Sequence, residues 1–157
     1  MKDHDKKFLV QAIALAEKSI HEGGGPFGAI IVKDDEIIAW GNNKVVKDHD
    51  PTAHAEIIAI RNACKKLGTY ELKGCTIYSN CEPCPMCLGA LYWTRIDKIV
   101  YASSRHDAAQ IGFNDAFIYD ELALMPNRRS IIMEQLVVPE AAHVFQQWCE
   151  KSDKKMY

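Results

Sequence analysis

Apolar residues follow two different periods along the chain, and these periods predict its helices and strands. Spacings of three and four residues are typical of an amphipathic helix. Short β-branched and apolar runs between Gly, Pro and Asp residues are typical of strands. In chain order the pattern predicts a helix at 5–22, strands at 27–33 and 36–41, a polar loop at 42–52, a helix at 54–68, a strand at 75–79, a helix at 85–94, a strand at 96–102, helical segments at 106–111 and 115–124, a strand at 130–138 and a helix at 139–150.

This order of elements predicts an α/β fold built on one sheet of five strands. The hairpin at 27–41 is antiparallel by necessity, whereas strands that are joined through a helix run parallel. We therefore expect a mixed, mostly parallel five-stranded sheet with helices on both faces, in three layers. No repeat or linker interrupts the alternation, so we expect residues 1–157 to form a single domain.

Composition places the chain among ordinary globular proteins. Of its 157 residues, 48% are apolar and 25% are charged, which excludes disordered and collagen-like chains. The net charge of −2 differs from the basic excess that nucleic-acid binders usually carry. The N-terminus does not resemble a signal peptide, and no apolar run approaches the ~18 residues of a membrane span. We therefore expect a cytoplasmic protein that binds neither membranes nor nucleic acids.

Two short segments contain candidate metal ligands, and each segment opens a predicted helix. The first contains His54 and Glu56, and the second contains Cys84 and Cys87. The positive end of a helix favours the thiolate, which is the form of cysteine that binds metal. A catalytic zinc takes three protein ligands and keeps one position for water. His54, Cys84 and Cys87 supply these three ligands.

Each segment alone has a more ordinary explanation. A Cys-x-x-Cys pair is often a structural zinc clip or a redox pair, and His54 alone could be a surface residue at a helix end. Together the segments match the H-x-E…P-C-x-x-C signature of zinc nucleobase deaminases, which predicts that Glu56 shuttles protons. Cys81 has the same spacing to Cys84, but it precedes the helix. We therefore expect Cys81 to be a buried cysteine and not a ligand.

Five segments of the sequence resemble one enzyme superfamily. PTAHAEIIAI and SNCEPCPMCLGALYW are similar to the cytidine-deaminase superfamily, in the branch that holds tRNA adenosine deaminases and bacterial guanine deaminases. GGPFGAIIVKD, Gly41-Asn42-Asn43 and DAAQIGFNDAFIY resemble the guanine deaminases most. The resemblance spans nearly the whole chain and implies a cytidine-deaminase-like fold. It also implies one Zn²⁺ per subunit and a homodimer that exchanges its C-terminal segments.

The resemblance further implies a reaction and a set of site residues. The reaction is hydrolysis of guanine, a small purine base, to xanthine and ammonia, with zinc-bound hydroxide attacking C2. The implied residues are His54, Cys84 and Cys87 for zinc, Glu56 for proton transfer, Asp115 for the leaving amine, Asn43 for the purine edge, Phe27 and Trp93 for the pocket walls, and Tyr157 for closure of the pocket in its own or a neighbouring subunit.

Several of these residues have alternative roles. Asn43 could cap a turn and Asp115 could begin a helix, which are common positions for these residue types. Phe27 and Trp93 could be ordinary core aromatics, and Tyr157 could belong to a frayed terminus.

Other functions also stay open at this point. The chain could deaminate guanosine, or adenosine in tRNA, or it could be a non-catalytic zinc-binding module. A tRNA substrate calls for a basic surface, whereas residues 107–121 are rich in acidic side chains. A decayed site would have no need of the carboxylate of Glu56.

Overall fold

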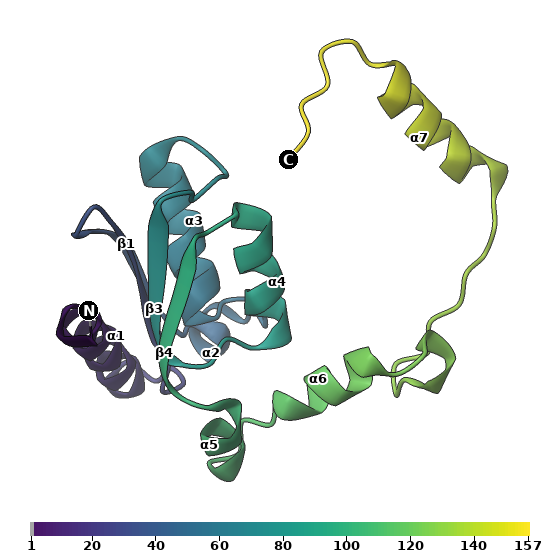
Figure 1. Ribbon diagram of the computed structural model, residues 1–157. Coiled ribbons are helices and arrows are strands. Elements are labelled where there is room, and N and C mark those ends of the chain that lie inside the picture. The colour runs from purple at the N-terminus through teal and green to yellow at the C-terminus, as the bar shows by residue number, and fades with distance from the viewer. Residues whose placement is uncertain (1) are drawn as a thin grey trace. The chain divides into compact units, whose positions relative to one another are not determined.

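The computed structural model describes residues 2–157, which form two compact units, residues 2–119 and 120–157. The first unit contains a sheet with helices around it (Figure 1). Its elements are α1 (Lys2–His21), β1 (Gly28–Lys33), β2 (Glu36–Asn42), α2 (Val45–Asp48), α3 (Ala55–Leu67), β3 (Cys75–Cys81), α4 (Pro85–Thr94), β4 (Lys98–Ser103), α5 (Arg105–Gln110) and the first half of α6 (Ala116–Ala123). The second unit contains the second half of α6, the 3₁₀ helix η1 (Pro126–Arg128) and α7 (Pro139–Glu150).

Most of the predicted elements are confirmed within a few residues at each end. The predicted loop at 42–52 is only partly right, because it contains the short helix α2. Its two valines are apolar, but four residues are too few for a helical period to be recognised. Among residues 2–157, no helix combines the length and the apolar character that crossing a membrane requires.

The strand directions differ from the predicted ones. The strand order is β2-β1-β3-β4, in which β1 pairs antiparallel with both β2 and β3, and β3 pairs parallel with β4. The sheet is therefore mixed but not mostly parallel. The helix α3 does join two strands of the same direction, β2 and β3, but β1 lies between them and runs opposite to both. A helix that connects two strands of one sheet makes them run in the same direction, but it does not determine which strands lie next to each other.

The predicted fifth strand, at 130–138, is wrong. Within residues 2–157 the sheet has four strands, and residues 130–138 have neither helical nor strand structure. Their apolar side chains are exposed, with Ile132 at 82% and Leu136 at 86%. A strand forms only where a neighbouring strand accepts its hydrogen bonds, and an apolar run in the sequence does not identify that neighbour.

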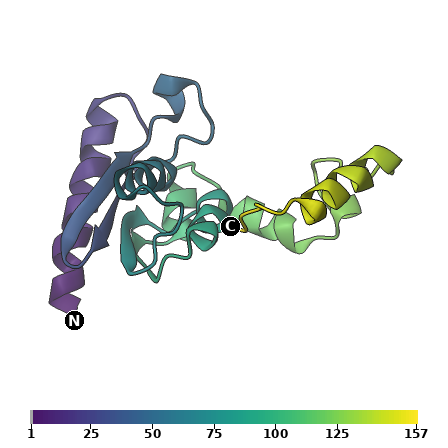
Figure 2. The same cartoon turned by 90° about the horizontal axis from the view of Figure 1, so that it is seen from above.

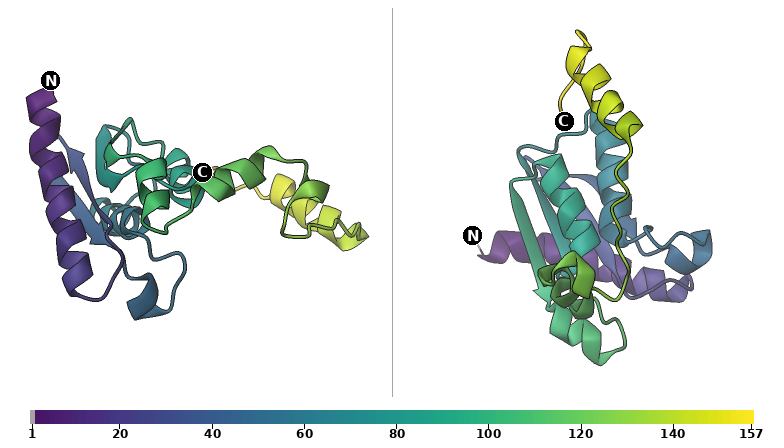
Figure 3. Two further views of the ribbon diagram at one scale, coloured as in Figure 1. Left: turned by 90° about the horizontal axis from the view of Figure 1, so that it is seen from below. Right: turned by 90° about the vertical axis from the view of Figure 1, so that its right-hand side faces the viewer.

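The helices cover both faces of the sheet, as predicted. Successive strand residues point to opposite faces. One face joins α3 and α4 in a core that includes Ala29, Ile31, Ala59, Ile77 and Leu91. The other face packs on α1 through Phe8, Ala12, Ile30, Val32 and Tyr78. Seen from above and below the first view, α1 lies on one side of the strands and α3 and α4 on the other (Figures 2 and 3).

The sheet and α3 approach each other closely at Gly41 of β2. A Cβ atom on Gly41 would lie 2.3 Å from the carbonyl oxygen of Ala55 and 2.8 Å from the amide nitrogen of Ala59. Both are backbone atoms of the first turns of α3, so a side chain could not be accommodated by a change of rotamer. The lack of a side chain at Gly41 therefore sets how near the start of α3 lies to the sheet.

The second unit buries few of its side chains. Its polar contacts are local: Glu121 accepts hydrogen bonds from the amide and the hydroxyl of Ser130, at 2.6 and 2.7 Å. The residues of α7 that its pattern predicts to face inward include Phe145 and Trp148, which are 75% and 39% exposed. Residues 120–157 thus carry an apolar helix face that their own fold leaves uncovered.

The contact at Gly41 predicts a stability difference between two glycine variants. Gly41→Ala should lower the free energy of unfolding by about 1–3 kcal/mol, because the added methyl group overlaps backbone atoms. Gly89→Ala, in α4, is the matched control, since a Cβ there has nothing within 4 Å. It should raise stability by about 0.5–1 kcal/mol through helix propensity. Thermal unfolding followed by circular dichroism measures both; equal midpoints would contradict the close contact.

Candidate active site

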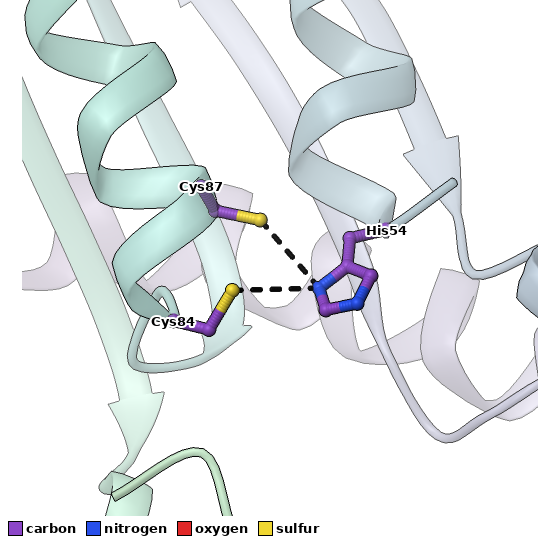
Figure 4. Close-up of side chains that lie close together, drawn as sticks. All are labelled: His54, Cys84 and Cys87. Atoms are coloured by element: carbon purple, nitrogen blue, oxygen red, sulfur yellow. Dashed lines mark hydrogen bonds between the residues drawn. The ribbon is translucent and has the colours of Figure 1, made fainter. Parts of the chain in front are cut away.

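Two helix N-termini bring the three predicted metal ligands together (Figure 4). His54 is the residue before the first turn of α3, and Cys84 holds the same position before α4. Both have extended backbone, and neither side chain makes a capping hydrogen bond. Pro85 occupies the first turn of α4, where a missing N–H is tolerated. Cys87 follows within the same turn, so the side chains of Cys84 and Cys87 both face His54.

The distances between the ligand atoms fit a zinc ion. The Sγ atoms of Cys84 and Cys87 each lie 3.6 Å from Nδ1 of His54. All three ligand atoms lie within 4.8 Å of one another, and this is the group among residues 2–157 that could hold a metal. Tetrahedral zinc with Zn–S ~2.3 Å and Zn–N ~2.0–2.1 Å places sulfur and nitrogen ~3.5 Å apart. The three side chains are therefore already spaced for the ion.

The electrostatics of the cluster differ for its two cysteines. The hydrogen bond with Cys84 and burial raise the pKa of the Cys87 thiol, whose thiolate would form when a metal ion binds, whereas Cys84 favours the thiolate already. Hydrogen bonds from the thiol of Cys87 and from His54 hold the pKa of the Cys84 thiol well below its ordinary value. The N-terminus of α4 adds positive potential at the same point. Two thiolates and a neutral imidazole balance the charge of a divalent ion, which agrees with a buried site.

Glu56 is a buried carboxylate in the first turn of α3. Burial raises its pKa to about 7, and the negative charge on Cys84 acts in the same direction. The positive charge of a bound zinc ion acts in the opposite direction and favours the carboxylate. A carboxyl group that changes protonation state so near to neutral pH is suited to accepting and returning a proton.

A cavity of about 590 Å³ opens beside the cluster, within the unit formed by residues 2–119. Its volume is in the range of pockets for small molecules, ~300–1,000 Å³. Six of the predicted site residues line it, and these are Phe27, Asn43, His54, Glu56, Cys84 and Asp115. The structure thus brings the ends of β2, β3 and two helices to one pocket.

Asn43 is held with its amide oxygen turned towards the backbone. Its Oδ1 accepts hydrogen bonds from the amides of Val45 and Gly25, at 3.2 and 3.4 Å. Asn43 therefore does cap a turn, and it lines the cavity as well. Within residues 2–157, no acceptor pairs with its two side-chain N–H groups. These N–H groups are what the side chain can offer to a ligand.

Asp115 carries the strongest sign that the cavity accepts a polar group. Its Oδ1 is buried and has no hydrogen-bond partner among residues 2–157. Burial raises the pKa of this carboxyl, and so does the negative charge on Cys84. A buried oxygen without a partner is costly. A ligand or water in the cavity would satisfy it.

Phe113 forms a wall of the cavity that was not predicted from the sequence. Its ring meets that of Phe27 edge to face, with centroids 4.8 Å apart, and both residues line the pocket. Phe113 lies two residues before Asp115, in a segment that resembles the guanine deaminases. Proximity to Asp115 was the available signal, but the weak helical pattern around it did not show where the ring points.

The predictions for one further cysteine and for two aromatic residues have different outcomes. Cys81 is buried and lies outside the metal cluster, as predicted; its thiol donates to the carbonyl oxygen of Ser104 at 3.8 Å. Trp93 is 66% exposed on α4 and is not among the cavity residues of the 2–119 unit. Tyr157 is 70% exposed and belongs to the other unit. The pocket roles of Trp93 and Tyr157 stay predictions.

Comparisons with known proteins agree with this site. Residues 2–103 match the cytidine and deoxycytidylate deaminase zinc-binding region. The chain belongs to this deaminase family. It is 50% identical over 151 residues to guanine deaminase of Bacillus subtilis (strain 168), which covers 96% of this chain and 97% of the relative. It is 39% identical over 146 residues to a tRNA-specific adenosine deaminase of Aquifex aeolicus (strain VF5), covering 92% and 93%.

A solved structure matches over almost the same length. The crystal structure of guanine deaminase from Bacillus subtilis superposes with a TM-score of 0.94 and covers 97% of this chain and 98% of its own. The cytidine-deaminase-like fold is therefore confirmed, apart from the strand count and directions given above. Zinc is confirmed as the cofactor by the family's zinc-binding region together with the cluster of His54, Cys84 and Cys87. This deaminase is thus a zinc-dependent aminohydrolase.

The cluster predicts which cysteine variants lose zinc. Cys87→Ala should lose bound zinc, because only two protein ligands remain. Cys81→Ala is the matched control: this cysteine is equally buried and nearby but lies outside the cluster, so its zinc should stay near one ion per chain. Mass spectrometry of the metals bound to purified, dialysed protein gives the ratio. Loss of zinc from Cys81→Ala with retention in Cys87→Ala would reverse the ligand assignment.

Proposed function

We propose that this deaminase hydrolyses guanine to xanthine and ammonia. One observation carries the choice of substrate. Against 39% identity over 92% of the chain to the tRNA-specific adenosine deaminase of Aquifex aeolicus, the chain is 50% identical over 96% of its length to the guanine deaminase of Bacillus subtilis. That similarity therefore includes Phe113 and Asp115, which line the cavity beyond the zinc-binding region. A cavity of about 590 Å³ has room for a purine base.

The proposed mechanism divides recognition from proton transfer. The side-chain N–H groups of Asn43 donate to an acceptor on the purine edge, and Phe27 contacts the ring. His54, Cys84 and Cys87 would hold the zinc ion, which would supply Lewis-acid chemistry that lowers the pKa of water from 15.7 towards ~7. Glu56 accepts a proton from the attacking water as that water adds to C2 of the purine, and Glu56 then protonates the adjacent ring nitrogen.

The amine leaves in the second half of the reaction. The bond between C2 and its exocyclic nitrogen breaks as the hydroxyl on C2 gives up its proton and becomes a carbonyl, and the nitrogen takes up one proton and leaves as ammonia. Asp115 is suited to this step, because burial favours its protonated form and its Oδ1 has no partner among the described residues. Water and guanine are thereby converted to xanthine and ammonia without another reactant.

The role of Glu56 is tested by replacing its carboxyl group. Glu56→Gln keeps the size of the side chain but cannot accept the proton, so kcat for guanine should fall by a factor of about 10²–10⁴. Zinc content should be unchanged, because Glu56 is not part of the metal cluster. Ammonia release measures the rate. Turnover close to that of the wild type would remove Glu56 from the mechanism.

A panel of amines tests the substrate itself. Guanine, guanosine, adenine, cytosine, cytidine and a tRNA anticodon stem-loop are offered to the zinc-loaded enzyme. The 39% identity to a tRNA-specific adenosine deaminase makes the stem-loop the main competitor. Its turnover, with none of guanine, would replace the proposed function.

We further propose that the 157-residue chain acts as one deaminase domain whose C-terminal segment is exchanged in a homodimer. The support is the uncovered apolar surface of residues 120–157, which Phe145 of α7 exemplifies at 75% exposure. On the first unit, Tyr92 of α4 is 77% exposed. Exposed apolar surface of this extent is typical of an interface. In this arrangement Trp93 and Tyr157 would complete the pocket from a neighbouring subunit.

Removal of Tyr157 tests the exchange. The variant that ends at residue 156 should fold and bind zinc normally but should lose most of its guanine turnover, because the pocket stays open to water. Mixing this variant with Glu56→Gln should restore part of the activity if Tyr157 closes the partner's pocket. A lack of recovery on mixing, with sedimentation showing a monomer, would contradict the exchange.

We place the reaction in the cytoplasm on chemical grounds. The zinc ligands Cys84 and Cys87 must stay reduced, and all six cysteines are free. A reducing compartment maintains that state.

A further inference from the structure

The end of α1 makes direct contact with the segment that carries Asn43. One polar side chain from its last turn and one from the residue after it are involved. The hydroxyl of Ser19 donates to the carbonyl oxygen of Asn43 at 3.1 Å. The carboxylate of Glu22 accepts a hydrogen bond from the side chain of Asn42 at 3.1 Å. The end of α1 and the residue that follows it therefore hold the last residue of β2 and the next one.

Ser19 has no exposure to solvent, and this makes its hydroxyl group informative. The hydroxyl of a fully buried serine is expected to form a hydrogen bond with another buried polar group. Here that group is the backbone carbonyl of Asn43, whose side chain lines the cavity. Removing the hydroxyl would leave the carbonyl oxygen of Asn43 without this donor.

Gly24 makes the same junction tight. Its amide donates to the carbonyl oxygen of Ser19 at 2.8 Å. A Cβ atom on Gly24 would lie 2.4 Å from the carbonyl oxygen of Asn43 and 2.6 Å from Oγ of Ser19. The glycine run after α1 therefore does more than end the helix. It lets the chain pass close enough for Ser19 to reach Asn43, and it places the amide of Gly25 against Oδ1 of Asn43 at 3.4 Å.

We propose that Ser19 is a positioning residue for substrate recognition and acts through Asn43. Ser19 fixes the backbone of Asn43, while Gly25 and Val45 fix its amide oxygen. The side-chain N–H groups then point in one direction before the purine arrives. Because the groups are ordered in advance, binding loses less conformational entropy. This role concerns binding of the base and leaves the zinc cluster and Glu56 untouched.

The inference rests on the proposed function, and kinetics separate the two. Ser19→Ala should raise KM for guanine roughly five- to tenfold, with kcat within twofold of the wild type and zinc content unchanged. The control is Thr94→Val, which removes another buried hydroxyl whose acceptor is the carbonyl oxygen of Leu91, in α4. Thr94→Val should lose comparable stability without a change in KM.

The outcomes are distinct. A KM for Ser19→Ala that equals that of Thr94→Val would overturn the positioning role, as would a fall in kcat with KM unchanged. If Ser19→Ala does not fold, Ser19→Cys keeps the shape of the side chain but is a weak donor, and the same shift in KM is expected. If the wild type deaminates another base instead of guanine, the proposed substrate fails, and the same comparison is made with the base that it does accept.

Discussion

The active site depends on the apolar contact between the first turns of α3 and α4. Ile57 of α3 packs against Cys84 and Cys87, and these three residues form one buried cluster. This contact holds two helix N-termini face to face, with the sulfur atoms 3.6 Å from the imidazole of His54. The two cysteine ligands are thus packed against Ile57, a side chain that takes no part in coordination. The positive ends of both helices add their potential at the point where two thiolates are needed.

Around this contact the fold retains polar groups that are unfavourable for stability. The carboxyl groups of Glu56 and Asp115 are raised in pKa by burial, and one oxygen of Asp115 has no partner among residues 2–157. Such groups are tolerated where the surrounding packing is strong. The sheet supplies this packing, since Ile31 and Ile77 lie fully buried behind α3, the helix that carries Glu56. Stability and reactivity therefore come from neighbouring layers of the same unit.

The sequence was most informative where residue types that bind metals stand at the start of a predicted helix. His54 and the pair Cys84 and Cys87 were identified from residue type and spacing because each begins a predicted helix, and helix starts constrain where such side chains can lie. The pattern of short apolar and β-branched runs also identified the four strands that exist. It failed at 130–138, where an apolar run signals a buried face but the partner surface is not encoded in the run itself. For the same reason, the sequence did not show that β1 lies between β2 and β3.

Site residues on irregular segments were harder to derive from the sequence. Asn43 and Asp115 were assigned through resemblance, since a turn asparagine and a helix-start aspartate are common. Phe113 was missed because the direction of a loop side chain depends on tertiary contacts. Ser19 was unrecognisable for a related reason: it lies 24 residues from Asn43 in the sequence, and its hydroxyl looks like any other polar group on a helix.

The separate supports of Asn43 and of the zinc ligands have an evolutionary consequence. The metal ligands stand at the starts of α3 and α4, whereas Asn43, the residue that we propose binds the base, directly follows β2 and is held by Ser19 of α1. Substitutions around Asn43 can therefore alter which amine is accepted while the hydrolytic machinery is inherited intact. Relatives with different names, such as a guanine deaminase and a tRNA-specific adenosine deaminase, can diverge in this way from one ancestral scaffold.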